Sequence, residues 1–189
     1  PFLELPTGVP YPMKSGFNVA FISTFANDEP VDEVVAAAAL VPEVNFYITG
    51  DTRRRPAEFF AAAPPNVTFT GFLNPNGEYL GLLRGMDAAI VLTTRNYTLQ
   101  LGGCEAVAVG KPLITSDWPY LHEVFGGGTL FVPNTTEGIR DGVMDMRERH
   151  EELAREVVVF RAASRREWDD RMSQLEAMVA RSHAARGAG

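Results

Sequence analysis

Short apolar segments alternate along the chain with longer stretches in which apolar residues recur at helical spacing. The apolar segments lie at residues 17–22, 44–49, 67–70, 88–93, 113–115 and 130–132. They are apolar on both faces that a strand would present, which is typical of a parallel sheet covered by helices on both sides. The pattern therefore predicts an α/β fold with a doubly wound parallel sheet of about six strands.

The segments between these strands carry signals for the starts and ends of helices. Three helices are expected to be capped, by Asn27 or Asp28, by Asn76, and by Thr135 or Thr136. Further helices are expected at residues 54–62, in the stretch that ends at Gly110, around His122 and Glu123, and at 151–161 and 164–181. Each would cover one face of the sheet.

The two ends of the chain differ from this repeating pattern. Residues 1–15 are rich in proline and have no apolar periodicity, so we expect an interdomain linker there. Residues 16–183 are expected to form one domain, and residues 184–189 a frayed tail. The chain also begins without methionine, so we expect it to be a piece of a longer polypeptide.

Polar or glycine-containing turns follow four of the predicted strands. They are Ser23-Thr24, Gly50-Asp51, Gly71-Phe72 and residues 94–96. Binding sites in parallel α/β sheets lie at the carboxyl ends of the strands, where the strand order reverses. These turns are therefore expected to line one crevice.

Composition and charge exclude several classes of protein. The net charge of −7 argues against a nucleic-acid surface, which needs a concentrated basic patch. The sequence has no apolar run long enough to span a membrane, and it opens without the features of a signal peptide. The single cysteine, Cys104, cannot form an internal disulfide, which favours a reducing, cytoplasmic location. The chain has no Cys/His cluster with zinc spacing, so no metal site is expected.

The common nucleotide and hydrolase motifs are missing. No GxGxxG, GxxxxGK[ST] or GxSxG pattern occurs, which argues against NAD-dependent, P-loop and α/β-hydrolase chemistry. What remains is the stretch from residue 94 to 114, which reads as a turn, a glycine-rich helix carrying Glu105, and a second strand. Glu105 could be a ligand or an ordinary solvated helix carboxylate.

Several short motifs in a fixed order resemble a known family. They are Ile48-Thr49-Gly50-Asp51, then Pro65-Asn66-Val67-Thr68-Phe69-Thr70-Gly71, then Glu105-Ala106 through Gly110-Lys111-Pro112, and Glu123. Together they resemble the carboxy-terminal, Rossmann-like domain of GT-B glycosyltransferases, in particular the retaining group 1 or family 4 enzymes. The resemblance runs from about residue 17 to Trp168.

This resemblance implies a donor-binding domain. The full enzyme would transfer a hexose from a UDP- or GDP-type sugar to an unidentified acceptor bound by a missing amino-terminal domain. Peripheral contact with a membrane is possible through that missing domain. The resemblance implies no cofactor or metal, and an isolated domain that is inactive. In such a domain Glu105 would bind the ribose hydroxyls, and the base would meet Gly71, Phe72 and Leu73. The diphosphate would meet backbone amides at a helix start, from Thr98, Leu99, Gln100 and Leu101.

The sequence departs from the family at two places. The position of a second glutamate is taken by Tyr97, and the first strand–helix loop, from Ser23 and Thr24 onwards, carries no cation. Arg95 is a candidate replacement, and a surface arginine is the equal alternative. These departures favour a second hypothesis, that the domain belongs to a GT-B-like epimerase or is a degenerate, non-catalytic nucleotide-sugar-binding domain. A receiver-type binding module is weaker, because Asp28 and Glu29 lie too far into the loop.

Overall fold

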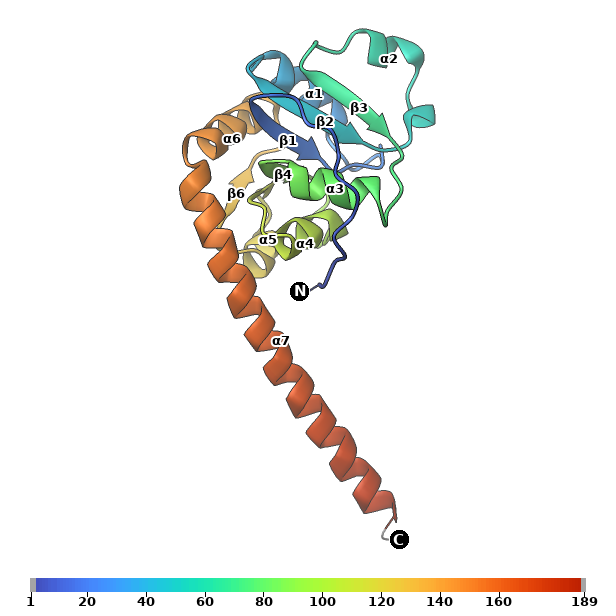
Figure 1. The fold of residues 1–189 in the computed structure, drawn as a ribbon, viewed down its shortest axis with the longest axis vertical. Coiled ribbons are helices and arrows are strands. Elements are labelled where there is room, and N and C mark those ends of the chain that lie inside the picture. The colour runs from blue at the N-terminus through green and yellow to red at the C-terminus, as the bar shows by residue number, and fades with distance from the viewer. Residues whose placement is uncertain (1–2, 188–189) are drawn as a thin grey trace.

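The computed structural model describes residues 3–187 and confirms the doubly wound α/β fold (Figure 1). Its single sheet has six parallel strands in the order β3-β2-β1-β4-β5-β6. The strands are β1 (Phe17–Phe21), β2 (Val44–Thr49), β3 (Val67–Gly71), β4 (Ala88–Val91), β5 (Leu113–Ser116) and β6 (Thr129–Val132). The order reverses between β1 and β4, which places the crevice of a parallel α/β sheet there.

Helices cover both faces of the sheet, as the apolar segments predict. They are α1 (Val31–Ala39), η1 (Thr52–Arg54), α2 (Ala57–Ala61), α3 (Glu78–Gly85), α4 (Leu101–Ala108), α5 (Pro119–Val124), α6 (Thr136–Glu148) and α7 (His150–Gly187). Successive residues of a strand alternate between the two cores: Val19 and Phe21 pack with α1 and α6, whereas Ala20 packs with α3, α4 and α5. Both faces of the central strands are therefore buried from solvent.

One of the three predicted helix caps is found. Thr135 accepts a hydrogen bond from the Gly138 backbone N–H at the start of α6. The α1 helix instead begins after Pro30 without a side-chain cap, because Asp28 accepts a hydrogen bond from the Thr93 hydroxyl at 3.0 Å. The α3 helix follows Gly77, so the prediction that Asn76 caps it is wrong.

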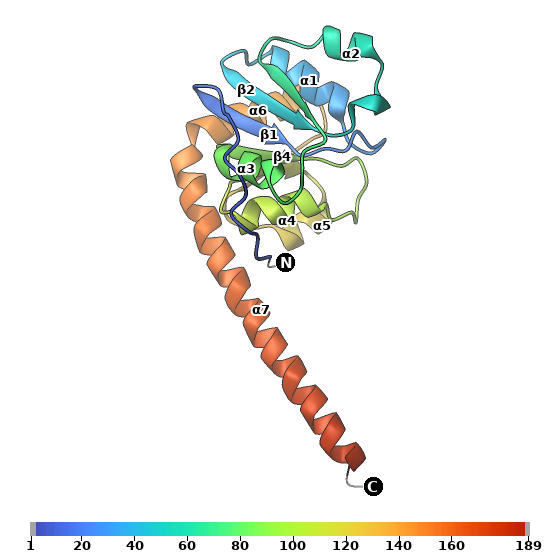
Figure 2. The same cartoon turned by 45° about the vertical axis from the view of Figure 1, so that its right-hand side comes forward.

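The last helix is longer than predicted. Residues 151–161 and 164–181 form one helix, α7, because Ala162 and Ala163 join them with strong helix formers and no Gly or Pro intervenes. Leu153 and Val157 anchor its first turns in the two cores, and the rest projects away from the domain (Figures 1 and 2). The helix continues through Gly187, and residues 188–189 of the expected tail lie outside the described residues.

Residues 3–16, before β1, run over the outside of α3 and form no helix or strand. Arg84 in α3 donates to the carbonyls of Leu5 and Pro6, both at 2.8 Å, and the Val9 N–H donates to the Gly77 carbonyl. Gly81 permits this path, because a Cβ there would lie 1.7 Å from the Val9 oxygen. This segment is therefore held on the surface of the domain.

Candidate functional site

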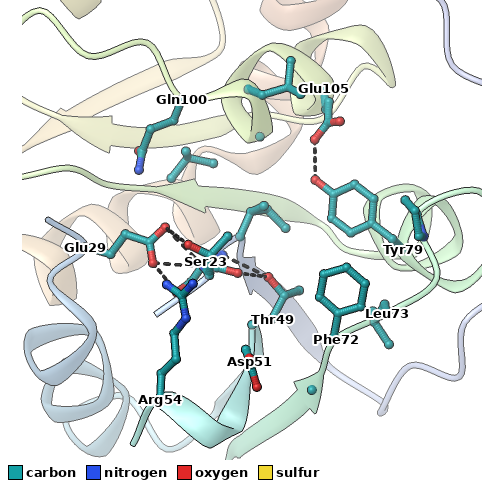
Figure 3. A pocket seen from close by; sticks show the side chains of 18 of the residues that line it. Ser23, Glu29, Thr49, Asp51, Arg54, Phe72, Leu73, Tyr79, Gln100 and Glu105 are labelled. Carbon is teal, nitrogen blue, oxygen red and sulfur yellow. Dashed lines mark hydrogen bonds between the residues drawn. The ribbon is translucent and has the colours of Figure 1, made fainter. Parts of the chain in front are cut away.

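A pocket of about 790 Å³ opens at the reversal in strand order (Figure 3). Its wall comes from the loops that follow β1, β2 and β3 and from the first turns of α4. Its volume is in the range of small-molecule sites, which is about 300–1,000 Å³. Of the predicted site residues, those that line the pocket are Ser23, Thr24, Gly71, Phe72, Leu73, Gln100, Leu101 and Glu105.

The loop after β1 folds around its own carboxylate. Glu29 accepts hydrogen bonds from the Ser23 hydroxyl at 2.7 Å and from the backbone N–H groups of Thr24 and Ala26, each at 2.9 Å. Phe25 between them takes a left-handed conformation with a φ of 58°, and its side chain is buried. The donors of this loop are therefore already occupied by an anion from the chain itself.

The turn after β2 brings three charged side chains to the pocket. Asp51 accepts two hydrogen bonds from the Arg53 guanidinium, each at 2.8 Å, and caps η1 by accepting from the Arg53 N–H. These contacts hold the pKa of Asp51 at about 2, so this carboxylate stays charged at neutral pH. Arg54, next along the turn, points into the pocket (Figure 3).

Two glycines bring the start of α4 close to the sheet. A Cβ on Gly102 would lie 2.8 Å from the Ile22 side chain, and one on Gly103 would lie 2.8 Å from the Phe125 ring. Gln100, Leu101 and Gly102 line the pocket, so the start of α4 lies at its edge. The first N–H groups of a helix have no acceptor within their own helix and favour a negatively charged ligand.

Glu105 lies one turn further along α4 and is paired with a tyrosine of α3. The Tyr79 hydroxyl donates a hydrogen bond to Oε2 of Glu105, and both side chains line the pocket (Figure 3). Burial, and then the hydrogen bond to Glu105, raise the pKa of Tyr79 well above its ordinary value. Tyr79 is therefore a protonated donor that fixes the orientation of the carboxylate.

Four predicted residues do not line the pocket. They are Arg95, Tyr97, Thr98 and Leu99. Helix α4 begins only at Leu101, so Thr98 and Leu99 belong to the preceding loop. Tyr97 is 81% exposed, has a φ of 58° and packs its ring near Tyr120. The structure therefore brings only the second half of the predicted phosphate turn to the pocket.

Sequence reasoning missed four residues of the pocket wall that carry charge or a buried donor. They are Glu29, Arg53, Arg54 and Tyr79. Arg54 was expected inside a helix over residues 54–62, whereas it belongs, with Arg53, to the separate turn η1. No sequence pattern gave Tyr79 a role. The position of Arg54, in the turn after a strand that ends at the crevice, was the one signal that could have found it.

Within residues 3–187, no three His, Cys, Asp or Glu side chains come together in a way that could hold a metal ion. In the same part of the chain no helix is both long and apolar enough to cross a membrane.

Comparison with known proteins identifies the family. The sequence profile of the family described as "Glycosyl transferases group 1" matches residues 16–149. The chain belongs to this family. The match covers the whole sheet and ends just before α7, so every wall of the pocket lies within it.

Solved structures of other glycosyltransferases have the same fold. Sucrose-phosphate synthase from Thermosynechococcus elongatus aligns with a TM-score of 0.68 and 19% identity, over 93% of this chain and 51% of that one. HepE of Anabaena, solved in complex with UDP-glucose, aligns with a TM-score of 0.66 and 16% identity, over 79% of this chain and 44% of that one.

TarM aligns with a TM-score of 0.63 and 18% identity, over 85% of this chain and 34% of that one. This group 1 chain thus spans about half the length of sucrose-phosphate synthase, and less of the other two. A search of curated protein sequences gave no significant match. The fold agrees with the expected carboxy-terminal half of a GT-B glycosyltransferase.

Proposed function

We propose that the chain is the donor-binding domain of a retaining glycosyltransferase. The full enzyme would transfer a hexose from a nucleotide-diphosphate sugar to an acceptor held by a separate amino-terminal domain. The observation that carries this proposal is Glu105, a carboxylate fixed by Tyr79 inside the pocket, one turn from the start of α4. A carboxylate has two acceptor oxygens, which suit the pair of ribose hydroxyls of a nucleotide.

The remaining pocket wall has suitable partners for the other parts of a donor. The start of α4 at Gln100, Leu101 and Gly102 offers backbone amides to the diphosphate. Phe72 at the mouth is 82% exposed and offers a ring on which a base can stack. HepE, which has this fold, was solved with UDP-glucose and with UDP, so we take UDP as the first nucleotide to test.

The domain itself would bind and orient the donor. The proposed mechanism needs no metal or cofactor and no general base from this half, because the acceptor is bound elsewhere. Residues 1–189 alone are therefore expected to bind donor without transferring sugar. Detectable glycosyl transfer by this chain would contradict the assignment. The lone Cys104 is buried in α4, and a free thiol fits the proposed cytoplasmic location.

Calorimetric titration with UDP, GDP and the 2′-deoxy form of each tests the proposal. We expect one of the two diphosphates to bind, and the ribonucleotide of the matching base to bind about tenfold more tightly than its 2′-deoxy form. Glu105→Gln should weaken binding and abolish that difference. Equal affinity of the ribo and deoxy forms for the unchanged chain would refute the role of Glu105, and no binding of either diphosphate would refute the function.

A second candidate is a domain that binds the donor without helping to transfer the sugar, or one from a GT-B-like epimerase. Two observations favour it: Tyr97 is exposed and lies outside the pocket, and Glu29 occupies the donors of the β1 loop. The full-length chain, incubated with UDP-glucose and a cell extract that supplies acceptors, separates these outcomes. Release of UDP with a glucosylated product supports the transferase, a sugar epimer supports the epimerase, and unchanged UDP-glucose supports the non-catalytic domain.

A further inference from the structure

The charges around the pocket create a problem for a diphosphate ligand. The wall contains three carboxylates, Glu29, Asp51 and Glu105, and two guanidinium groups, Arg53 and Arg54. A nucleoside diphosphate adds at least two more negative charges. Binding it therefore requires a cation or amides that are not already engaged by these carboxylates.

Most of the positive partners are already engaged. The loop after β1 donates the N–H groups of Thr24 and Ala26 to Glu29, so it cannot cradle a phosphate without releasing that carboxylate. Arg53 is held in a two-bond ion pair by Asp51. These two groups neutralise charges of the chain itself, not charges of the ligand.

Arg54 is the exception. Its side chain is exposed and points into the pocket, and within residues 3–187 it forms no ion pair or side-chain hydrogen bond (Figure 3). Its turn follows β2, whereas the start of α4 follows β4, and these strands flank β1 on its two sides. A diphosphate seated above the end of β1 would therefore lie between Arg54 and the first amides of α4.

We propose that Arg54 binds the diphosphate of the donor and takes the part of the cation that the loop after β1 lacks. The inference rests on the proposed function. Arg95, which the sequence offered as the replacement cation, is exposed and lies outside the pocket, whereas Arg54 lies on the opposite side of β1 and lines the pocket. A guanidinium presents a planar set of N–H donors that fits phosphate oxygens, and it keeps its charge at any physiological pH.

The proposal is tested by calorimetry with UDP and uridine as probes, on the unchanged chain and on two variants. Arg54→Gln should weaken UDP binding about tenfold and leave uridine binding within about twofold, because only UDP carries the diphosphate. Arg95→Gln removes the same charge from outside the pocket and should change neither affinity. The gap between the unchanged chain and Arg54→Gln should narrow at high salt.

The outcomes separate this inference from the function on which it rests. If the unchanged chain binds UDP and Arg54→Gln binds it equally well, Arg54 has no role and the donor-binding function stands. If both nucleotide and nucleoside lose affinity equally, Arg54 acts on the shape of the pocket, and the inference is again wrong. If the unchanged chain binds no UDP or GDP, the function and the inference fail together.

Discussion

Tyr79 and Glu105 meet in the pocket from two different helices, and their pairing is directly testable. The Tyr79 hydroxyl donates to Oε2 of Glu105 and is kept protonated, its pKa being raised first by burial. Tyr79→Phe keeps the packed ring and removes only this donor. We expect the preference for UDP over 2′-deoxy-UDP to fall about threefold or more, because the carboxylate loses its fixed orientation.

The control for Tyr79→Phe is the thermal stability of the same variant. A phenylalanine in the same space should leave the unfolding temperature nearly unchanged, so a loss of ribose preference would come from Glu105 alone. An unchanged preference between the two nucleotides would show that Tyr79 is only part of the packing.

Asn66 is a second residue with an individual role, in this case structural. It is 7% exposed, and its Nδ2 donates to the carbonyls of Ala38, Val41 and Val44 at 2.9, 3.1 and 2.9 Å. Asn66→Ala removes the donor that ties these carbonyls together, while those of Ala38 and Val41 keep the N–H groups of Val41 and Val44, so we expect the free energy of unfolding to fall by about 1–2 kcal/mol. Urea denaturation measures this, and Asn76→Ala, on the exposed surface, should cost less than about 0.5 kcal/mol.

For single residues, the sequence predicts which element carries a side chain better than it predicts what that side chain binds. Glu105 could be placed because its glycine neighbours and the following Gly110-Lys111-Pro112 define the element that carries it. The roles of Arg54 and Glu29 could not be predicted, because they depend on which neighbouring hydrogen-bond donors are already engaged. That depends on loop geometry, and periodicity carries no information about loop geometry.

Among the elements, helix α3 and the segment across it form one packed unit. The Val9 carbonyl lies where a side chain at position 81 would start, 1.7 Å from the ideal Cβ site. Gly81→Ala must therefore displace the segment and break its contacts with Arg84 and Gly77. We expect a loss of about 2 kcal/mol or more in unfolding free energy and faster proteolysis before residue 14.

Gly77→Ala is the matched control for this close approach. The nearest atoms to a Cβ at position 77 are 3.8 and 3.9 Å away, so Gly77→Ala should leave the segment in place and its proteolysis unchanged. Because Gly77 is the N-cap of α3 with φ −134° and ψ −93°, the variant should still lose about 1 kcal/mol of unfolding free energy at the helix start. If Gly81→Ala also left the proteolysis unchanged, the segment would be loosely attached in solution, and the linker expected at residues 1–15 would be free.

The pattern of apolar residues predicts where the strands and helices lie, but it predicts less accurately where each helix begins. All six strands were expected at their observed places, because five of them contribute apolar residues to both cores and β3 contributes to one. The caps at Asn27 or Asp28 and at Asn76 were wrong, since the polar side chain of Asp28 bonds to a neighbouring loop in place of the helix. Tertiary partners of this kind are invisible to local sequence rules.

The whole molecule has a feature that a single domain does not explain. Beyond its anchored first turns, α7 carries Trp168, Met172, Leu175 and Val179 along one side, and three of these are 46–50% exposed. The spacing of four, three and four residues places them on one helix face. An apolar stripe on a projecting helix is suited to a contact outside this domain, such as the proposed amino-terminal domain.

This contact can be tested by measuring amide hydrogen exchange along α7, both in residues 1–189 alone and in the full-length chain. Amides of residues 169–181 should exchange quickly in residues 1–189, because this part of α7, beyond the Arg165–Glu4 ion pair, contributes no residue to either core. We expect protection at least tenfold greater in the full-length chain, while the anchored turn near Leu153 and Val157 changes little. Equal exchange in both would mean that the other domain leaves the stripe uncovered.

The central claim is that the pocket between β1 and β4 is a nucleotide-diphosphate site. A crystal structure determined from crystals of the chain soaked with UDP would test this site directly. We expect the ribose hydroxyls within hydrogen-bond distance of Glu105, and the diphosphate between Arg54 and the first amides of α4. UDP bound at any other place on the chain, or in this pocket with its ribose away from Glu105, would rule out the proposed site.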